Sequence, residues 1–356
     1  DKWNITKTTD ALSTETSYAY DSDGNLSTKT DVFGTESYTY NSFGEMLTYT
    51  GRMGEVWTNT YDVNGNLLTA KDPLNNVTTL DYPATGNIGL PKSVKDARNN
   101  TTKLNWFAVS GLLDELEDPY GKKTNFTYDT RGRTKTITNA LGHVTTYNYF
   151  DDTSRKVELV YPNSDKITYK YDIRRLLESV TDERGKVTNY EFDPQRRLTK
   201  ITDPLGHIKQ FGYDMMSNMT SYTDALGNVT LYEMDDFDRL KKITYPAATS
   251  GGTAFLEQYL YDKLGRITKY TDTAGRETIY AYNDAARTNT VMNAEAEVTT
   301  TKYNQRFQTT EVKDAINQVY TFGYDPLGRL LSQTRAGGTV SFQYDEVGNR
   351  KKRIDY

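Results

Sequence analysis

One short pattern recurs along the whole sequence at a period of about 21 residues, which is typical of a repeat protein whose copies pack on their neighbours. Each copy centres on an aromatic or apolar anchor, usually the tyrosine of a Tyr-Asp pair. Most anchors follow the previous one at an interval close to that period. The anchors are Tyr20, Tyr40, Tyr61, Tyr82, Trp106, Tyr128, Tyr149, Tyr171, Phe192, Tyr213, Met234, Tyr261, Tyr282, Tyr303, Tyr324 and Tyr344.

Each copy has two similar halves. In many copies a second aspartate follows the first by ten positions, and glycine or asparagine often stands three places after either one. Aspartate bonds the backbone of a turn, and glycine or asparagine adopts the positive φ that closes a short hairpin. We therefore predict a ring-stacking role for tyrosine, a turn-bonding role for aspartate and a chain-reversing role for glycine. The residues of this structural signature are Tyr61, Asp62, Gly65, Asp72, Tyr128, Asp129, Gly132, Tyr171, Asp172, Asp182, Gly185, Tyr213, Asp214, Asp224, Gly227, Tyr261, Asp262, Gly265, Asp272, Gly275, Tyr324, Asp325 and Gly328.

The segments between turns have the composition of strands. About six or seven residues remain there, which is enough for one strand and too short for a helix. Segments 144–149, 187–192 and 277–282 are typical, with threonine and two aromatic residues at positions i and i+2. That spacing places both rings on one face of a strand, so we expect a ladder of rings across neighbouring hairpins.

The other strand of each copy has an odd apolar spacing. An apolar residue stands five places after the first aspartate, and a second often follows three places later, as in Leu198 and Ile201. Residues three apart in a regular strand face opposite sides. The spacing indicates either a bulge or a strand covered on both faces, and the sequence does not choose between them.

These features predict an all-β fold of tandem antiparallel β-hairpins in one long, coiled sheet, either a spiral shell or an open superhelical segment. We expect residues 1–356 to form a single array of about 16 units, with longer insertions near 82–106 and 245–258. Residues 1–6 and 353–356 are repeat-like, so we expect the chain to be a window of a longer protein.

Composition excludes several classes of function. The net charge is −5, and basic residues are interspersed with acidic ones, which argues against a nucleic-acid or anionic-membrane surface. No apolar run approaches the ~20 residues of a membrane span. Cysteine is absent, which removes disulfides, thiolate metal sites and a cysteine nucleophile.

Three residue patterns are candidates for chemistry, and we interpret each as structural. His143 and His207 both follow Leu-Gly, where asparagine stands in other copies, so we expect post-turn residues and not a metal pair. Segments 21–25 and 62–66 resemble the start of a calcium loop, but the glutamate at its twelfth position is missing. Arginine four places after aspartate, as in Asp129 and Arg133, indicates weak surface ion-pair ladders between hairpins. We therefore expect no catalytic, cofactor or metal site.

Segments 128–133, 261–266 and 324–330 resemble the YD repeat of the RHS family, and residues 271–275 match the other half of its signature. The resemblance extends from about Tyr18 to Tyr344 and is weakest between Tyr82 and Asn125. The family includes bacterial polymorphic and wall-associated toxins, shell components of insecticidal toxin complexes, and teneurins. It implies a sheet that spirals into a hollow shell, which in the toxins encloses a C-terminal toxic polypeptide. Asp203-Pro204 and Asp325-Pro326 lie in ordinary turns, so we expect no self-cleavage there.

Two hypotheses about function follow. The first is a structural shell or scaffold segment of a large bacterial protein, secreted or at the cell surface or wall, whose partners are further repeats and a C-terminal toxin of the same polypeptide. The alternative is an adhesion module that holds carbohydrate of a cell surface on repeated aromatic rows. An enzyme is not expected.

Overall fold

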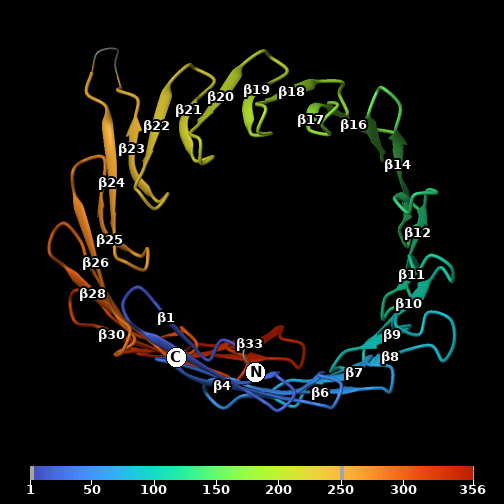
Figure 1. Cartoon of the computed structure of the whole chain (residues 1–356), viewed down its shortest axis with the longest axis horizontal. Helices are drawn as coiled ribbons and strands as arrows, with labels where there is room; N and C mark the ends of the chain where they lie inside the picture. Colours follow the sequence, from blue (N-terminus) through green and yellow to red (C-terminus); the bar gives the residue numbers. More distant parts are fainter. Residues whose placement is uncertain (1–3, 249–251, 356) are drawn as a thin grey trace. The chain divides into compact units, whose positions relative to one another are not determined.

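The computed structural model describes residues 4–248 and 252–355, and in these ranges the chain consists of β-strands and the turns between them (Figure 1). The described part contains no helix, and so none that could cross a membrane. Three residues of the expected insertion near 245–258, 249–251, lie outside the described residues, as do 1–3 and 356. The all-β prediction is confirmed.

Short strands follow one another with turns between them, and all belong to one antiparallel sheet. Most strands are five to seven positions long, because a turn begins at almost every aspartate or asparagine of the repeat. The strands are β1 Lys7–Thr9, β2 Glu15–Tyr20, β3 Leu26–Asp31, β4 Gly34–Tyr40, β5 Met46–Thr50, β6 Val56–Tyr61, β7 Leu67–Lys71, β8 Val77–Asp81, β9 Ser93–Lys95, β10 Thr101–Trp106, β11 Leu113–Glu117, β12 Lys123–Tyr128, β13 Thr134–Thr138, β14 Val144–Phe150, β15 Lys156–Val160, β16 Lys166–Tyr171, β17 Leu177–Thr181, β18 Val187–Phe192, β19 Leu198–Thr202, β20 Ile208–Tyr213, β21 Met219–Thr223, β22 Val229–Met234, β23 Leu240–Tyr245, β24 Phe255–Tyr261, β25 Ile267–Thr271, β26 Glu277–Asn283, β27 Thr288–Met292, β28 Val298–Tyr303, β29 Thr309–Lys313, β30 Val319–Tyr324, β31 Leu330–Arg335, β32 Gly338–Tyr344 and β33 Arg350–Ile354.

A β-bulge explains the odd apolar spacing. Phe192 of β18 pairs with Leu198 of β19, but its neighbour Glu191 pairs with Lys200, so Thr199 is an extra residue. Because of this extra residue, Leu198 and Ile201 lie opposite Phe192 and Tyr190, which share one face. The same shift recurs in many hairpins, including β12–β13, β16–β17 and β30–β31. Of the two interpretations that the sequence left open, the bulge is correct.

The sheet has almost no buried core. Only Gly51, Glu55, Ile243, Asp325 and Asp345 are buried among the described residues, and no large side chain there is fully enclosed. Along strands such as β2 and β12, half-buried residues alternate with exposed ones. The hairpins therefore shelter one face by packing side by side, as expected of a repeat array.

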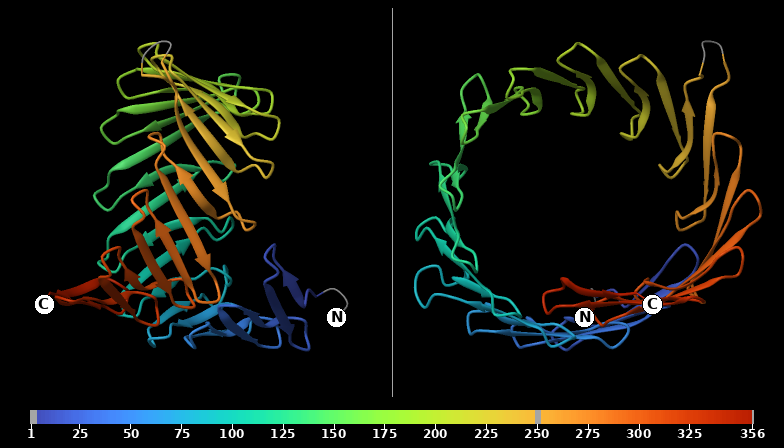
Figure 2. Two further views of the ribbon diagram at one scale, coloured as in Figure 1. Left: turned by 90° about the vertical axis from the view of Figure 1, so that its left-hand side faces the viewer. Right: turned by 180° about the vertical axis from the view of Figure 1, so that it is seen from behind.

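The chain divides into two compact units, which are described separately. Unit 1 comprises the described residues of Asp1–Lys103, Tyr261–Lys269 and Glu277–Tyr356, and unit 2 comprises those of Leu104–Leu260 and Tyr270–Arg276. Within unit 1, hairpins of the C-terminal stretch lie beside hairpins of the N-terminal stretch (Figure 2). The division of the array into about sixteen sequence copies remains a prediction.

Candidate functional site

The repeated turn is the most regular arrangement of side chains in the molecule. In the turn at Asp21, the carboxylate Oδ1 accepts the backbone N–H groups of Asp23 at 3.0 Å and Asn25 at 2.8 Å. The second oxygen, Oδ2, accepts the side-chain amide of Asn25 at 3.1 Å. Both oxygens of the carboxylate are thus used to close the turn. Segment 62–66 has the same arrangement around Asp62.

The partner at the fourth place after the aspartate varies in type but keeps its geometry. It is asparagine at Asn76 and Asn228, arginine at Arg266, and histidine at His207, whose Nδ1 lies 2.8 Å from Asp203 Oδ2. His143 places its backbone N–H on Asn139 Oδ1, in the same turn position. Among the described residues no group of three His, Asp or Glu side chains could hold a metal ion.

The third residue after the aspartate or asparagine that begins a turn takes a left-handed backbone at almost every turn. Glycine is common there, as in Gly65 and Gly132, but Arg175, Arg196 and Phe307 also adopt positive φ. A non-glycine residue at positive φ is uncommon and strained. The hydrogen bonds of the aspartate therefore impose the turn, and glycine at the third position lowers the backbone strain of the positive φ.

We expect Gly275→Val to destabilise its own hairpin and leave distant hairpins paired. Gly275 has a φ of +77, and an added Cβ would meet nothing within 4 Å, so backbone strain alone sets the cost. For a β-branched residue that cost is about 2 kcal/mol. Hydrogen exchange of the amides in 267–283 measures it. Thr273→Val, in the same turn, is the control; equal exchange in both variants, or loss of the whole fold, contradicts the prediction.

The anchor tyrosines join consecutive strands. The hydroxyl of Tyr128 donates to the carbonyl of Leu113 at 2.8 Å, fifteen positions earlier. The hydroxyls of Tyr61, Tyr213 and Tyr324 make the same bond to the carbonyls of Met46, Leu198 and Thr309. Each of these hydroxyls therefore fastens the end of one strand to the start of the strand before it, and so links one sequence copy to the preceding copy, a role that the sequence did not reveal.

An arginine of one turn also reaches the next anchor ring. Arg266 pairs with Asp262 of its own turn at 2.7 Å, lies 4.3 Å from the ring centroid of Tyr282, and bonds Asp284 at 2.8 Å. Arg197 and Arg329 likewise lie over the rings of Tyr213 and Tyr344. The expected ion pairs between copies occur between Arg133 and Asp151 and between Arg266 and Asp284, but the i,i+4 pair of aspartate and arginine lies inside one turn. At several other turns the link to the next copy is the same arginine on a ring.

Stacked aromatic rings occur in short groups in the described residues. Tyr38, Tyr49 and Trp57 form one row, with neighbouring centroids 5.3 and 5.1 Å apart, and Tyr259 and Tyr270 form a pair. Rings at i and i+2 share a face, as predicted. At the end of β18, Tyr190 and Phe192 are half-buried, whereas Glu191 between them is exposed. The continuous ladder that we expected is replaced at several anchors by a ring facing an arginine.

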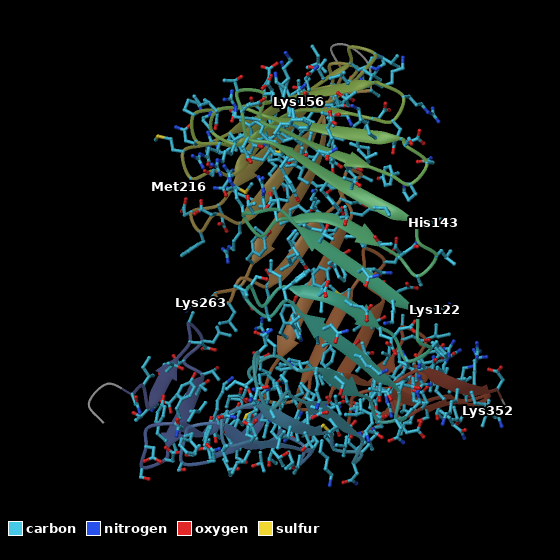
Figure 3. All side chains as sticks on the ribbon, turned by 90° about the vertical axis from the view of Figure 1, so that its right-hand side faces the viewer. Lys122, His143, Lys156, Met216, Lys263 and Lys352 are labelled. Atoms are coloured by element: carbon cyan, nitrogen blue, oxygen red, sulfur yellow. The ribbon has the colours of Figure 1, made fainter. Side chains whose placement is uncertain are left out.

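We expect Arg266→Met to destabilise unit 1 by about 1–2 kcal/mol, because the variant keeps the apolar stem but removes charge-assisted bonds and a cation–π contact. Urea unfolding measures the loss. Lys263→Met is the control, since Lys263 is an exposed residue of the same turn (Figure 3). Equal unfolding midpoints for the two variants contradict the prediction.

A contact region between distant parts of the sequence lies within unit 1, and we call it the seam. Here turns 31–34, 51–55 and 96–99 contact turns 304–308 and 345–349, and turn 325–329 lines a cavity together with turn 51–55. The first set consists of second turns of their copies, and the other set consists of turns that follow the anchor tyrosine. Four of the five buried residues of the described chain, Gly51, Glu55, Asp325 and Asp345, lie in these turns.

Ion pairs and rings hold the seam. Arg306 Nη1 lies 3.1 Å from Glu55 Oε1, and Arg98 Nη1 lies 3.1 Å from Asp345 Oδ2. Phe33 and Phe307 meet edge to face, with ring centroids 4.5 Å apart. A cavity of about 650 Å³ lies beside these contacts, lined by residues of both stretches.

The turn at Gly51 is specialised for the seam. Glycine replaces the usual aspartate, and the carboxylate of Glu55 accepts the backbone N–H of Met53 at 3.0 Å in its place. A Cβ on residue 51 would clash with that carboxylate, so a larger residue would displace it. The same carboxylate binds Arg306, and it therefore closes a turn and joins two stretches of chain.

The molecule is a β-hairpin repeat protein. Its repeated site is structural: aspartate closes most turns, and tyrosine and arginine join neighbouring strands. The chain belongs to the RHS-repeat family: the RHS Repeat model matches residues 4–36, 20–56, 128–166, 175–208, 308–340 and 324–355. No curated protein sequence matches the chain.

Solved structures share the fold. The crystal structure of TcdB2-TccC3 is 14% identical, with a TM-score of 0.60, and the match covers 98% of this chain and 24% of that one. The crystal structure of TcdB2-TccC3-TEV is also 14% identical, with a TM-score of 0.50, covering 94% of this chain and 18% of that one. The chain thus spans about a quarter or less of these two chains.

Proposed function

We propose that this chain is a wall segment of a shell in a large bacterial RHS protein, secreted or at the cell surface, and that the shell encloses a C-terminal toxin of the same polypeptide. The observation that carries the proposal is the seam. Hairpins far apart in the sequence meet there through ion pairs to buried carboxylates. A shell wall requires such contacts wherever distant parts of the sheet lie side by side.

The side-chain chemistry supports a containing role. The turn carboxylates accept N–H groups of their own turns, and His207 bonds Asp203 within its turn. These groups stabilise the wall, and the proposal assigns them no reaction. The mechanism is exclusion: a hydrogen-bonded sheet separates an enclosed polypeptide from proteases and from its targets.

Protease protection tests the proposal. The polypeptide that carries this segment and its C-terminal region is digested before and after Arg306→Met and Arg98→Met are introduced together. We expect the C-terminal region to be resistant in the unaltered protein and to be cut faster in the seam variant. Lys302→Met, which removes an exposed ion pair with Glu311, is the control. A C-terminal region that is cut equally fast in every protein contradicts the proposal.

A second candidate function is adhesion to carbohydrate, for which the row Tyr38, Tyr49 and Trp57 is the favouring observation. Trp57 also borders a cavity of about 340 Å³. A glycan array with the whole chain and with Trp57→Leu tests this candidate. Reproducible binding that the substitution abolishes favours adhesion, and binding that it leaves unchanged counts against it.

A further inference from the structure

A pocket of about 450 Å³ lies in unit 2 between the turns 129–133, 151–155 and 172–176. Its walls are the rings of Tyr149 and Tyr171 and the side chain of Val157, and exposed Phe150 and Ile173 form its rim. This volume is within the range of small-molecule sites.

Cationic side chains dominate the pocket. Arg133, Arg155, Lys156 and Arg175 line it, against two carboxylates, Asp151 and Asp152. Lys156 is labelled in Figure 3. In a chain whose net charge is −5, this is a local reversal of sign.

The carboxylates do not neutralise all the cations that face the pocket. Asp151 already pairs with Arg133 and Arg131, each at 2.8 Å, and Asp152 accepts the hydroxyl and N–H of Ser154. Within the described part of the chain, neither the Arg175 guanidinium nor the Lys156 ammonium makes a hydrogen bond or close ion pair, although the pKa of Asp152 is lowered by the hydrogen bond from Ser154 and also by the nearby charge of Lys156. These two cationic groups and the outer guanidinium nitrogens of Arg155 can therefore donate hydrogen bonds to a bound anion.

The pocket is also held in place. Arg155 Nε donates to the carbonyl of Tyr171 at 3.3 Å, and the N–H of Tyr171 donates to the carbonyl of Arg155 at 3.0 Å. Arg175 has a φ of +64, at a turn position where glycine is common.

The chain contains a natural counterpart that lacks two of the cations. The counterpart is the turn that follows Tyr282, which is one position shorter than the pocket turn that follows Tyr149. Arg266 bonds Asp284 there, as Arg133 bonds Asp151 in the pocket. The carbonyl of Arg287 accepts the N–H of Tyr303, as the carbonyl of Arg155 accepts that of Tyr171.

Two of the cations are among the residues that differ between the two hairpins, together with Phe150 and Val157, where the counterpart has Asn283 and Asn289. Lys156 is the first residue of its strand, and the equivalent first residue in the counterpart is Thr288. Arg175 stands at a turn position that Phe307 occupies in the counterpart. The shared backbone arrangement thus does not require lysine and arginine at these two positions.

We propose that this pocket binds a phosphate monoester. Two guanidinium groups and an ammonium suit a compact dianion, because arginine binds phosphate oxygens through paired N–H groups. The ring of Tyr171 and the side chain of Val157 offer an apolar wall to the organic part of the ligand, while the ring of Tyr149 has the Arg133 guanidinium 4.1 Å from its centroid. The inference is independent of the proposed shell function.

Calorimetry with the full chain and phenyl phosphate tests the proposal, with inorganic phosphate as a second ligand. We expect one saturable site, tighter binding of the ester, and about tenfold weaker binding for Arg175→Gly and for Lys156→Thr, as for loss of one charge-assisted bond. Both replacements occur naturally at equivalent positions, so the fold should persist. Circular dichroism checks that it does.

Arg196→Gly is the matched control, since Arg196 has a φ of +68 at the same position of a nearby turn and does not line the pocket. Equal weakening by this variant overturns the proposal. It is also overturned if chloride at the same ionic strength competes as well as phosphate does. Binding only to oligonucleotides, or only to vesicles with phosphorylated headgroups, would likewise show that the pocket does not take a free monoester.

Discussion

Arg306→Met is expected to lower the free energy of unfolding by about 3 kcal/mol, because it leaves the carboxylate of Glu55 buried without its partner. The side chain of Glu55 is 5% exposed and that of Arg306 is 20% exposed. Glu55→Gln combined with Arg306→Met removes the charge as well, so the double variant should recover part of the loss. Urea unfolding of the four proteins gives the coupling between the two residues.

Hydrogen exchange locates the effect. The amides of 51–56 and 304–308 should exchange faster in Arg306→Met, while those of unit 2 should not change. Lys302→Met is the control, because its partner Glu311 is at 2.8 Å in an exposed pair that contributes at most about 1 kcal/mol. The prediction is wrong if the two variants have the same stability and the same exchange pattern.

Acid is expected to unfold the array as the pH falls from about 5 to 2. The side-chain amides of Asn25 and Asn66 lower the pKa of Asp21 and Asp62, and the hydrogen bond from Arg239 lowers the pKa of Asp235 to about 2. A carboxyl whose pKa is lower in the folded state contributes stability above its unfolded pKa, and this contribution is lost as the pH falls through the folded value. Many turns repeat this contribution.

Circular dichroism against pH at low and high salt measures the acid transition. High salt screens general repulsion between positive charges, so a transition that persists there belongs to the turns. Asp235→Asn, combined with the same change at Asp21 and Asp62, should make the transition less steep, since asparagine at Asn41 and Asn139 closes equivalent turns without a charge. Unchanged structure between pH 5 and 2 in the unaltered chain contradicts the prediction.

The turns and strands were predictable because their cause is local. An aspartate and the residues up to four places after it contain all the bonds that close a turn, so the period of the sequence becomes the period of the fold. The spacing of Leu198 and Ile201 signalled an irregularity but left two interpretations, because a bulge depends on the partner strand.

The links between hairpins were harder to predict. Arginine recurs four places after aspartate, but the sequence does not show that the same guanidinium also reaches a ring in the next copy. The seam depends on contacts between residues far apart in the sequence, which no local pattern specifies. Its sign in the sequence is Gly51 with Glu55, where most other copies have aspartate or asparagine at the first position.

The scarcity of buried side chains has a consequence for how such a chain can change in size. A globular domain that gains or loses a segment must rebuild a shared interior, whereas here a hairpin needs only suitable flanking hairpins. Gene duplication or deletion of whole copies could therefore alter the dimensions of the protein stepwise, one copy at a time. The condition is that turns such as 51–55 still meet their distant partners.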